Sequence, residues 1–426
     1  MASSHRVLVV GAGAAGLWAA ERAARAQAEA GLPVAVQVLE KTGRVGTKVL
    51  ASGGTHCNLT TTLEPDEAVK LFGAAAERFL LPAFWNLPPL ALRERFHELG
   101  VQTVEAPLEK VFPKSGKARD VRDALERAAL EAGVRFEFDV RVVGVEREGE
   151  GWRVAAEDGR EFGAERVILC PGGQSYPKSG TTGDGYGWCR ELGLKLVDPV
   201  PALAPLVSPE NWPAQLAGVA PQDTEVRLLN TAGKVVARRR RPVVFTHRGL
   251  SGPGAMDVSE AVARYRAEGS VGAPPRVALD LMPDIGRDEL RDLLIAGAGA
   301  PGAPRVSRVL PVPVAKSLRA RIAVQAGLAE PDPRAGELGK GMRHGLVEAL
   351  KGLFVPVSQT EGWHKAEVTA CGVDLRQIDP DTYRVRGLGG LYIVGELLDL
   401  QGPIGGLNFQ AAWAAAELAG ADAGAP

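Results

Sequence analysis

The sequence predicts an α/β fold in which both ends of the chain form one layered domain and the middle forms a second domain. Over about the first 195 residues, short apolar runs alternate with amphipathic helical patterns, as a sheet with crossover helices requires. From Asp198 onwards, closely spaced prolines precede β-type alternation, which marks a domain boundary. From Glu367 the pattern returns to strand, glycine-rich turn and helix. We therefore expect the C-terminal segment to rejoin the first domain.

Apolar runs bounded by turn residues predict the main strands of the first domain. They lie at residues 6–10, 34–39, 166–170 and 391–394. Three further short strands, at residues 134–138, 141–148 and 152–157, predict a small antiparallel ribbon. Helical spacing of apolar residues predicts a covering helix at residues 118–132 and another helix at residues 411–418.

These patterns divide the chain into five segments. Residues 1–197 and 367–426 are the two parts of the first domain, residues 198–283 and 354–366 form a β-rich middle domain, and residues 284–353 form a helical insertion. The insertion is interrupted by an Ala/Gly/Pro-rich stretch at residues 296–304.

The charge balance excludes a generally basic nucleic-acid-binding protein. The 426 residues include 50 lysines and arginines against 51 aspartates and glutamates, so a charged partner must be met locally. The first strand begins near the N-terminus, and no uncharged apolar run reaches about 18 residues. We therefore expect a cytoplasmic protein without a signal peptide or a membrane contact.

The cysteines predict neither a metal site nor disulfides. Cys57, Cys170, Cys189 and Cys371 show no CxxC pair and no combination with histidines at zinc-ligand spacing. We expect four reduced thiols and no bound metal.

A glycine motif at the start of the chain predicts a dinucleotide site in a Rossmann-type domain. The motif GAGAAG directly follows the first strand and opens an alanine-rich helix, whose free N–H groups suit a pyrophosphate. Its predicted binding residues are Gly11, Gly13, Ala14, Ala15 and Gly16. Glu40 ends the next strand and is suited to the adenosine ribose hydroxyls.

A second GxGxxG match, at residues 297–302, is not predicted to bind a nucleotide. It follows a helical pattern, contains Pro301 and does not lead into a helix. The sequence therefore has one credible fingerprint, and NADH or NADPH would act as a transient reductant rather than occupy a permanent domain.

Two glycine-rich segments indicate that the dinucleotide is FAD. Residues 43–58 suit a backbone wrapped along phosphate and ribityl groups, with Arg44 and Lys48 as charge partners. Residues 395–410 lead into the C-terminal helix, whose positive N-terminal end would stabilise the negative charge of reduced flavin, while Asp399 suits the ribityl hydroxyls. The further predicted FAD-binding residues are Lys41, Arg44, Lys48, Ser52, Gly53, Gly54, Cys57, Asn58, Gly172, Gly173, Asp184, Gly395, Glu396, Asp399, Gly405, Gly406 and Asn408.

These motifs resemble those of the BaiN-like flavoproteins, often labelled aminoacetone oxidase-like, over nearly the whole chain. The resemblance rests on SGG..CN, GG.SYP..G.TGDGY and GE.LD..GP.GG.N.QAAW. It implies a Rossmann-type FAD domain built from both chain ends, with a β-barrel-like and a helical domain inserted between them. The family usually has GRK and GGGRCN where this chain has GTK and GGTHCN, so the family arginine of each motif is replaced.

Three side chains are candidates for catalysis. Cys57 lies in the wrapping segment as a proton donor or redox partner, or as a buried structural thiol. His56 and His247 stand in motif-like surroundings and could supply the proton that accompanies hydride transfer, or simply pack or cap a turn.

The arginine run at residues 238–241 is the one local basic cluster. It could meet RNA phosphates, or it could form a solvated strand face. The resemblance makes this alternative relevant, because some family members are described as reducing uridine to dihydrouridine in ribosomal RNA and others are linked to conjugated steroid double bonds.

The combined pattern predicts an FAD-dependent oxidoreductase in which NAD(P)H reduces FAD and the flavin passes hydride to an electron-poor double bond. The substrate would be a uridine in ribosomal RNA or a small conjugated carbonyl compound. An oxidase acting on a small amine or aminoketone and a non-catalytic FAD-binding sensor or scaffold are the alternatives. The oligomeric state and the choice between NADH and NADPH are not encoded in a recognisable motif.

Overall fold

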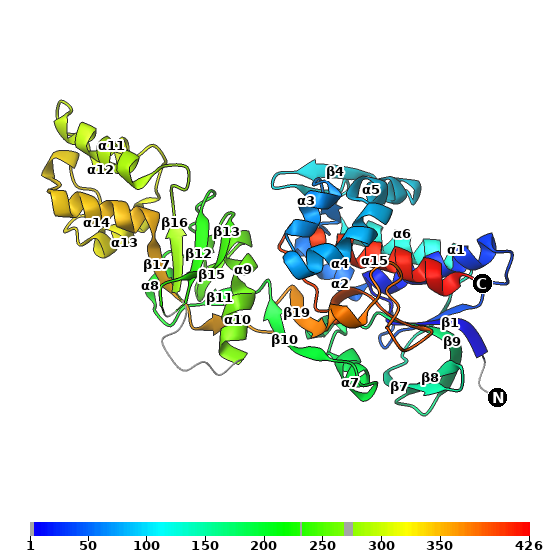
Figure 1. Cartoon of the computed structure of the whole chain (residues 1–426). Coiled ribbons are helices and arrows are strands. Elements are labelled where there is room, and N and C mark those ends of the chain that lie inside the picture. Colours follow the sequence, from blue (N-terminus) through cyan, green and yellow to red (C-terminus); the bar gives the residue numbers. More distant parts are fainter. Residues whose placement is uncertain (1–3, 231, 268–275) are drawn as a thin grey trace. The chain divides into compact units, whose positions relative to one another are not determined.

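The computed structural model describes residues 4–230, 232–267 and 276–426 (Figure 1). The chain divides into two compact units. Unit 1 comprises Met1–Val200 with Glu367–Pro426, and unit 2 comprises Pro201–Ala366. Each unit has its own buried apolar core.

Unit 1 is built on a seven-stranded sheet whose central strands are parallel. The order is β6-β2-β1-β9-β8-β7, and β20 pairs with β9. The bounds are β1 Ser4–Val10, β2 Val36–Leu39, β6 Arg135–Glu137, β7 Val142–Glu148, β8 Gly151–Ala156, β9 Glu161–Leu169 and β20 Leu391–Ile393. Strands β6, β2, β1, β9 and β20 run parallel, so their carboxyl ends lie at one edge. This confirms the predicted Rossmann-type domain made from both chain ends.

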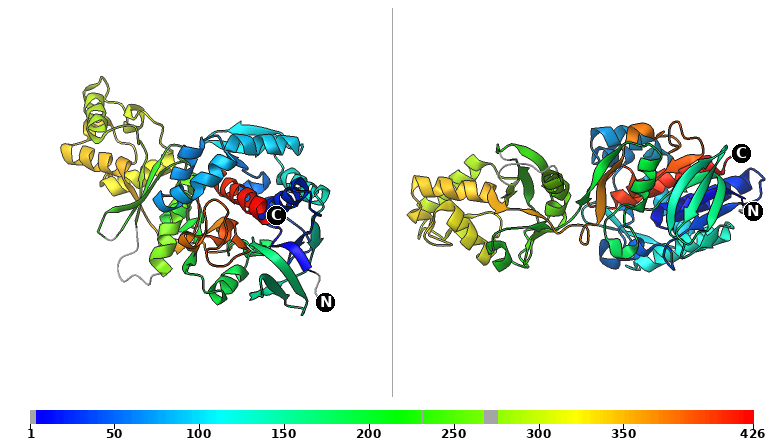
Figure 2. Two further views of the ribbon diagram at one scale, coloured as in Figure 1. Left: turned by 45° about the vertical axis from the view of Figure 1, so that its right-hand side comes forward. Right: turned by 90° about the horizontal axis from the view of Figure 1, so that it is seen from below.

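Helices α1 (Ala14–Glu29) and α15 (Leu407–Gly424) hold the two chain ends together, side by side in Figure 2. Small residues allow the close contact, since a Cβ on Gly420 would come within 2.6 Å of the Ala19 carbonyl oxygen. At one end of the pair, Trp413 Nε1 donates to the Ala14 carbonyl over 3.2 Å. The helix predicted at residues 411–418 is thus longer than expected.

One predicted strand pairs with a different neighbour from the one expected. The ribbon expected from three strands consists of β7 and β8, which pair antiparallel, and β8 continues the pairing onto β9. Strand β6 instead pairs in parallel with β2. The expectation for residues 134–138 was therefore wrong, because α6 (Ala118–Glu131) acts as a crossover helix that returns the chain parallel to β2.

The other elements of unit 1 surround this sheet. They are α2 Thr47–Ala51, α3 Pro65–Lys70, α4 Ala74–Asn86, α5 Pro89–Glu98, α7 Asp184–Glu191, the three-stranded sheet of β3 Thr60–Thr61, β5 Lys110–Pro113 and β4 Thr103–Ala106, the pair β10 Leu196–Ala202 and β19 Val368–Val373, and the short helices η1 Ser52–Thr55, η2 Pro177–Ser179, η4 Leu375–Gln377 and η5 Gly395–Leu397.

Unit 2 contains two four-stranded sheets and a helical part. One sheet is β14 Val244–Phe245, β15 Gly249–Ser251, β11 Leu206–Val207 and β18 Gln359–Thr360, and the other is β13 Val235–Arg240, β12 Glu225–Leu229, β16 Arg276–Asp280 and β17 Leu353–Pro356. The helices are α8 Trp212–Gln215, α9 Pro253–Asp257, α10 Ser259–Ala267, α11 Arg287–Gly299, α12 Val306–Val309, α13 Lys316–Ala326, η3 Ala335–Glu337 and α14 Lys340–Lys351. Both strand orders are open among the described residues, so the barrel-like closure is not confirmed.

The second GxGxxG match lies outside a strand–turn–helix unit, as predicted. Gly297 and Gly299 belong to the last turn of α11, and a Cβ on Gly297 would press on Val309. Within the described part of the chain, no helix is long and apolar enough to cross a bilayer.

The contact between α1 and α15 can be tested with two glycine substitutions. Gly420→Ala should lower the free energy of unfolding of unit 1 by about 2 kcal/mol, because the new methyl group meets backbone that cannot move aside. Gly187→Ala in α7 is the matched control, since its Cβ meets no described atom within 4 Å, and it should stabilise by up to ~1 kcal/mol. Denaturant unfolding measures both. Equal effects would contradict the proposed close packing.

Candidate functional site

Two glycines of the first motif are required by the fold itself. Gly11 has φ +101°, and a Cβ there would collide with the carbonyl oxygen of Cys170 at the end of β9. A Cβ on Gly16 would collide with the carbonyl oxygen of Gly11. The turn thus folds back tightly between two strands and the first turn of α1.

Gly13 has no such structural requirement. Its φ of −77° is open to any residue, and a Cβ there would meet no described atom within 4 Å. Gly13 is also the N-cap of α1 and provides no side-chain cap. Open space at an uncapped helix N-terminus fits a pyrophosphate, because the first-turn N–H groups and the helix dipole both favour an anion.

Glu40 lies beside this turn, at the carboxyl end of β2. One carboxylate oxygen accepts from the Ala12 N–H and the other from the N–H of Thr42, each over 2.8 Å. The carboxylate is therefore held against the glycine turn, with oxygen lone pairs available for the hydroxyl groups of a ribose.

Lys41 connects the β2 side of the site to α7. Its ammonium contacts Asp184 Oδ2 and Thr182 Oγ1, each at 2.7 Å. Burial acts to raise the pKa of Asp184, but the hydrogen bond and charge of Lys41 outweigh it and hold this pKa below the usual carboxyl value. Arg44, which was predicted as a charge partner, is exposed.

The wrapping segment contains left-handed backbone at several positions. Gly53 and Gly54 have φ values of 54° and 65°, and Cys57 has φ +57°. The Cys57 N–H donates to the Ser52 carbonyl, and Asn58 Oδ1 accepts from the Val111 N–H over 3.2 Å. These bonds hold the segment against β5.

Lys48 is held by protein groups rather than left free for a phosphate. Its ammonium contacts Glu396 Oε2 at 2.5 Å and Ser175 Oγ at 2.6 Å. The second oxygen of Glu396 accepts from Ser175 Oγ and from the Thr369 N–H, both at 2.6 Å. We call these four residues the Glu396 cluster. Ser175 and Thr369 were not among the predicted site residues; Ser175 belonged to a quoted motif, whereas Thr369 carried no signal.

The loop after β9 is fitted tightly around this cluster. A Cβ on Gly173 would collide with Thr369 Oγ1, which accepts from the N–H groups of Gln174 and Ser175. Gly172 has φ +76°, and a Cβ there would come within 2.7 Å of Thr181.

The C-terminal glycine loop meets the N-terminal turn. A Cβ on Gly395 would lie 3.3 Å from the Cβ of Ala15, in the first turn of α1. Gly406 has φ +82° and is the N-cap residue of α15. Like Gly13 on α1, it provides no side chain to bond the free N–H groups of the helix. The Asn408 amide pairs with both backbone groups of Gly402, at 2.8 and 2.9 Å.

Two more predicted residues lie in the same loop. The Asp399 N–H donates to the Val373 carbonyl, which attaches the loop to β19. A Cβ on Gly405 would meet no described atom within 4 Å. The predicted FAD residues from both chain ends thus surround the carboxyl edge of the parallel strands, which is where this fold class binds ligands.

The model of the HI0933-like protein Rossmann domain matches residues 5–422 of this chain. The chain belongs to the HI0933-like family. It is 31% identical to the 3-dehydro-bile acid delta(4,6)-reductase of Clostridium scindens over 98% of both chains. It is 27% identical to the ribosomal RNA dihydrouridine synthase of Escherichia coli over 96% of this chain and 95% of the relative.

Solved structures share the fold of this HI0933-like chain. The 3-ketosteroid delta1-dehydrogenase of Sterolibacterium denitrificans superposes with a TM-score of 0.52 at 15% identity, over 99% of each chain. The predicted family resemblance is confirmed, and this chain is an FAD-dependent oxidoreductase.

The candidate catalytic side chains of this HI0933-like chain lie in different surroundings. Cys57 is fully buried, and burial raises the pKa of its thiol to about 12 although a hydrogen bond with Ser52 acts to lower it. His56 is exposed, with Nδ1 2.7 Å from the Gly116 carbonyl. His247 is exposed in unit 2, between β14 and β15. The burial of Cys57 favours the structural alternative, and the roles of both histidines stay predictions.

The first three arginines of the run lie on β13, and two of them are closely paired with carboxylates. Arg239 pairs with the buried Asp257 at 2.7 Å. Arg240 contacts two carboxylates, those of Asp223 and Asp284, both at 2.6 Å. These pairs favour the interpretation as a solvated strand face.

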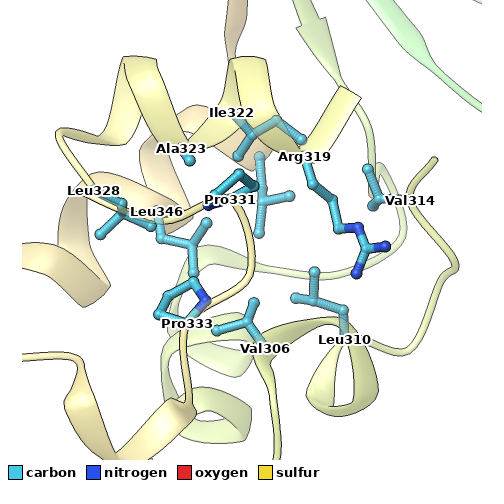
Figure 3. Close-up of a pocket in the computed structure, with 11 residues that line it drawn as sticks. Val306, Leu310, Val314, Arg319, Ile322, Ala323, Leu328, Pro331, Pro333 and Leu346 are labelled. Atoms are coloured by element: carbon cyan, nitrogen blue, oxygen red, sulfur yellow. The ribbon is translucent and has the colours of Figure 1, made fainter. Parts of the chain in front are cut away.

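A small pocket lies within the helical part of unit 2 (Figure 3). Its walls are mainly apolar and come from α12, α13 and α14, with Val306, Ile322 and Leu346 among them. Arg319 is the charged residue of the lining, and its guanidinium pairs with Asp332 at 2.7 Å. The positive charge of Arg319 is therefore already paired and is not free to bind a ligand in the pocket.

The inertness of the thiols can be tested directly. All four cysteines are buried, and at pH 8 a pKa of about 12 leaves a Cys57 thiolate fraction on the order of one in ten thousand. Titration of the folded protein with Ellman's reagent at pH 8 should therefore detect less than one thiol, and the protein unfolded in guanidinium should show four. A thiol that reacts within minutes in the folded protein, and disappears in Cys57→Ser, would restore Cys57 as a catalytic candidate.

Proposed function

We propose that this chain uses NADH or NADPH to reduce an electron-poor carbon–carbon double bond conjugated to a carbonyl group. The open space at Gly13 carries the dinucleotide part of the proposal, since the fold gives no reason for glycine there and a dinucleotide does. Both relatives named above act, by their names, as a double-bond reductase or a dihydrouridine synthase.

The chain's own groups would hold FAD in an extended form along the carboxyl edge of the sheet. The first turn of α1, from Gly13, would bind the pyrophosphate, and Glu40 the adenosine ribose. Asp399 would bind the ribityl chain, and the uncapped N-terminus of α15 at Gly406 would face the flavin. When bound, FAD supplies hydride transfer from the nicotinamide to the acceptor.

The protein's contribution to the reaction is orientation and charge stabilisation. One carbon of the double bond receives the hydride and the adjacent carbon receives a proton. Cys57 is fully buried, whereas His56 is exposed at the wrapping segment and is the candidate donor within unit 1.

A small conjugated carbonyl compound is the preferred substrate class. The 31% identity to a bile acid reductase supports it, and the carboxylate pairing of Arg239 and Arg240 weakens the case for an RNA-binding strand face. A uridine in ribosomal RNA is the second candidate, because a relative of 27% identity over nearly the whole chain carries that activity in its name.

Gly13→Val tests the cradle. The fold has room for the Cβ, so the cofactor-free protein should keep its melting temperature, while FAD affinity should fall by about tenfold or more because the side chain enters the phosphate space. Gly163→Val on β9 is the matched control, since its Cβ also meets no described atom and it lies toward the amino end of the strand. FAD fluorescence titration measures both. Unchanged affinity in Gly13→Val would refute this placement of the pyrophosphate.

Anaerobic reduction tests the direction of electron flow. Addition of NADH or NADPH should bleach the flavin absorbance, and a conjugated enone should restore it without oxygen. Absence of bleaching would support a sensor or scaffold, and rapid peroxide formation with an aminoketone would support an oxidase. Mass spectrometry of ribosomal RNA from a strain lacking the gene tests the second candidate, for which lost dihydrouridine is the expected result.

A further inference from the structure

The Glu396 cluster lies on the side of the cradle that would hold the flavin ring. Strand β1 stands between β2 and β9, and β20 pairs with β9. Glu40 follows β2, and Glu396 follows β20, so the two carboxylates lie on opposite sides of the glycine turn. A dinucleotide with its adenosine ribose at Glu40 extends its other end toward Glu396.

The cluster joins segments that are distant in the sequence. Lys48 comes from α2, Ser175 from the loop after β9, and Thr369 from β19. Three donors satisfy the Glu396 carboxylate at 2.5 to 2.6 Å: the Lys48 ammonium, the Ser175 hydroxyl and the Thr369 N–H. Of these only Lys48 carries charge, so Lys48 is the group that cancels the charge of Glu396.

The partial burial of this pair makes the neutralisation of Glu396 important for a nearby flavin. The side chains of Lys48 and Glu396 are 23% and 19% exposed, so water screens them only partly. Reduction adds negative charge to a flavin, and an uncompensated carboxylate nearby would oppose it.

We propose that Lys48 is a positioning residue that neutralises Glu396 beside the flavin ring and thereby sets the reduction potential of bound FAD. Lys48 therefore acts through Glu396 rather than as a phosphate ligand. The proposal rests on the FAD placement given under the proposed function.

Midpoint potentials of the FAD-loaded protein test the idea. Lys48→Met should lower the equilibrium constant for flavin reduction about tenfold, a shift of about −30 mV for a two-electron couple. Glu396→Gln should raise it, and the double variant Lys48→Met/Glu396→Gln should return it close to the wild-type value. Lys48→Arg keeps the charge and should also remain near wild type.

The pair formed by Lys41 and Asp184 provides a matched control. Its side chains have the same exposures, 23% and 19%, and its shortest contact is 2.7 Å. It follows Glu40 on the adenosine side, so Lys41→Met should leave the midpoint potential unchanged even if FAD is held less tightly.

The outcomes separate this inference from the proposed function. Wild-type protein that binds no FAD would end both. Bound FAD with equal midpoint potentials in Lys48→Met, Glu396→Gln and the wild type would overturn the inference alone. A double variant whose midpoint potential is shifted as far as that of Lys48→Met would also overturn it. The shift would then persist without the carboxylate of Glu396, so the charge of Glu396 could not be its cause. If Lys48→Met loses FAD, Glu396→Gln still decides the matter, because an unchanged midpoint potential in this variant would overturn the inference.

Discussion

The close contact between α1 and α15 is the constraint on which the rest of unit 1 depends. Gly420 brings α15 against the backbone of Ala19, and Trp413 donates to the Ala14 carbonyl at the beginning of α1. The contact carries the C-terminal loop to the glycine turn, where Gly395 approaches Ala15. Together with the pairing of β20 with β9, it brings the two halves of the cradle face to face although more than 350 residues separate them in sequence.

The three motif glycines are needed for different physical reasons, and this difference supports the proposed dinucleotide site. Gly11 and Gly16 are demanded by backbone that passes too close for a side chain, so they would be needed in a protein without any ligand. Gly13 has an ordinary φ and open space around it. The space lies at an uncapped helix N-terminus, which favours an anion, and a dinucleotide phosphate supplies one.

In both units, lysines and arginines that could contact a ligand are paired with carboxylates. Lys41 and Lys48, both predicted from the sequence to bind FAD, are each paired with a carboxylate, and so are Arg239 and Arg240 on β13. In the proposed placement of FAD, backbone N–H groups and helix ends would therefore bind the phosphates. This arrangement suits a reaction in which the cofactor carries the chemistry and the protein orients it.

The amino-acid sequence by itself determined the Rossmann-type domain, its construction from both chain ends and the family, because these follow from local patterns: strand, glycine turn, helix, and short motifs. Only the tertiary structure decided that β6 joins the parallel sheet, that Cys57 is sealed from solvent, and that Thr369 belongs to the site. The pairing of Lys48 with Glu396, 348 residues apart, is of the same kind. A side chain's partner and burial depend on which distant segments pack beside it, and no local pattern contains that information.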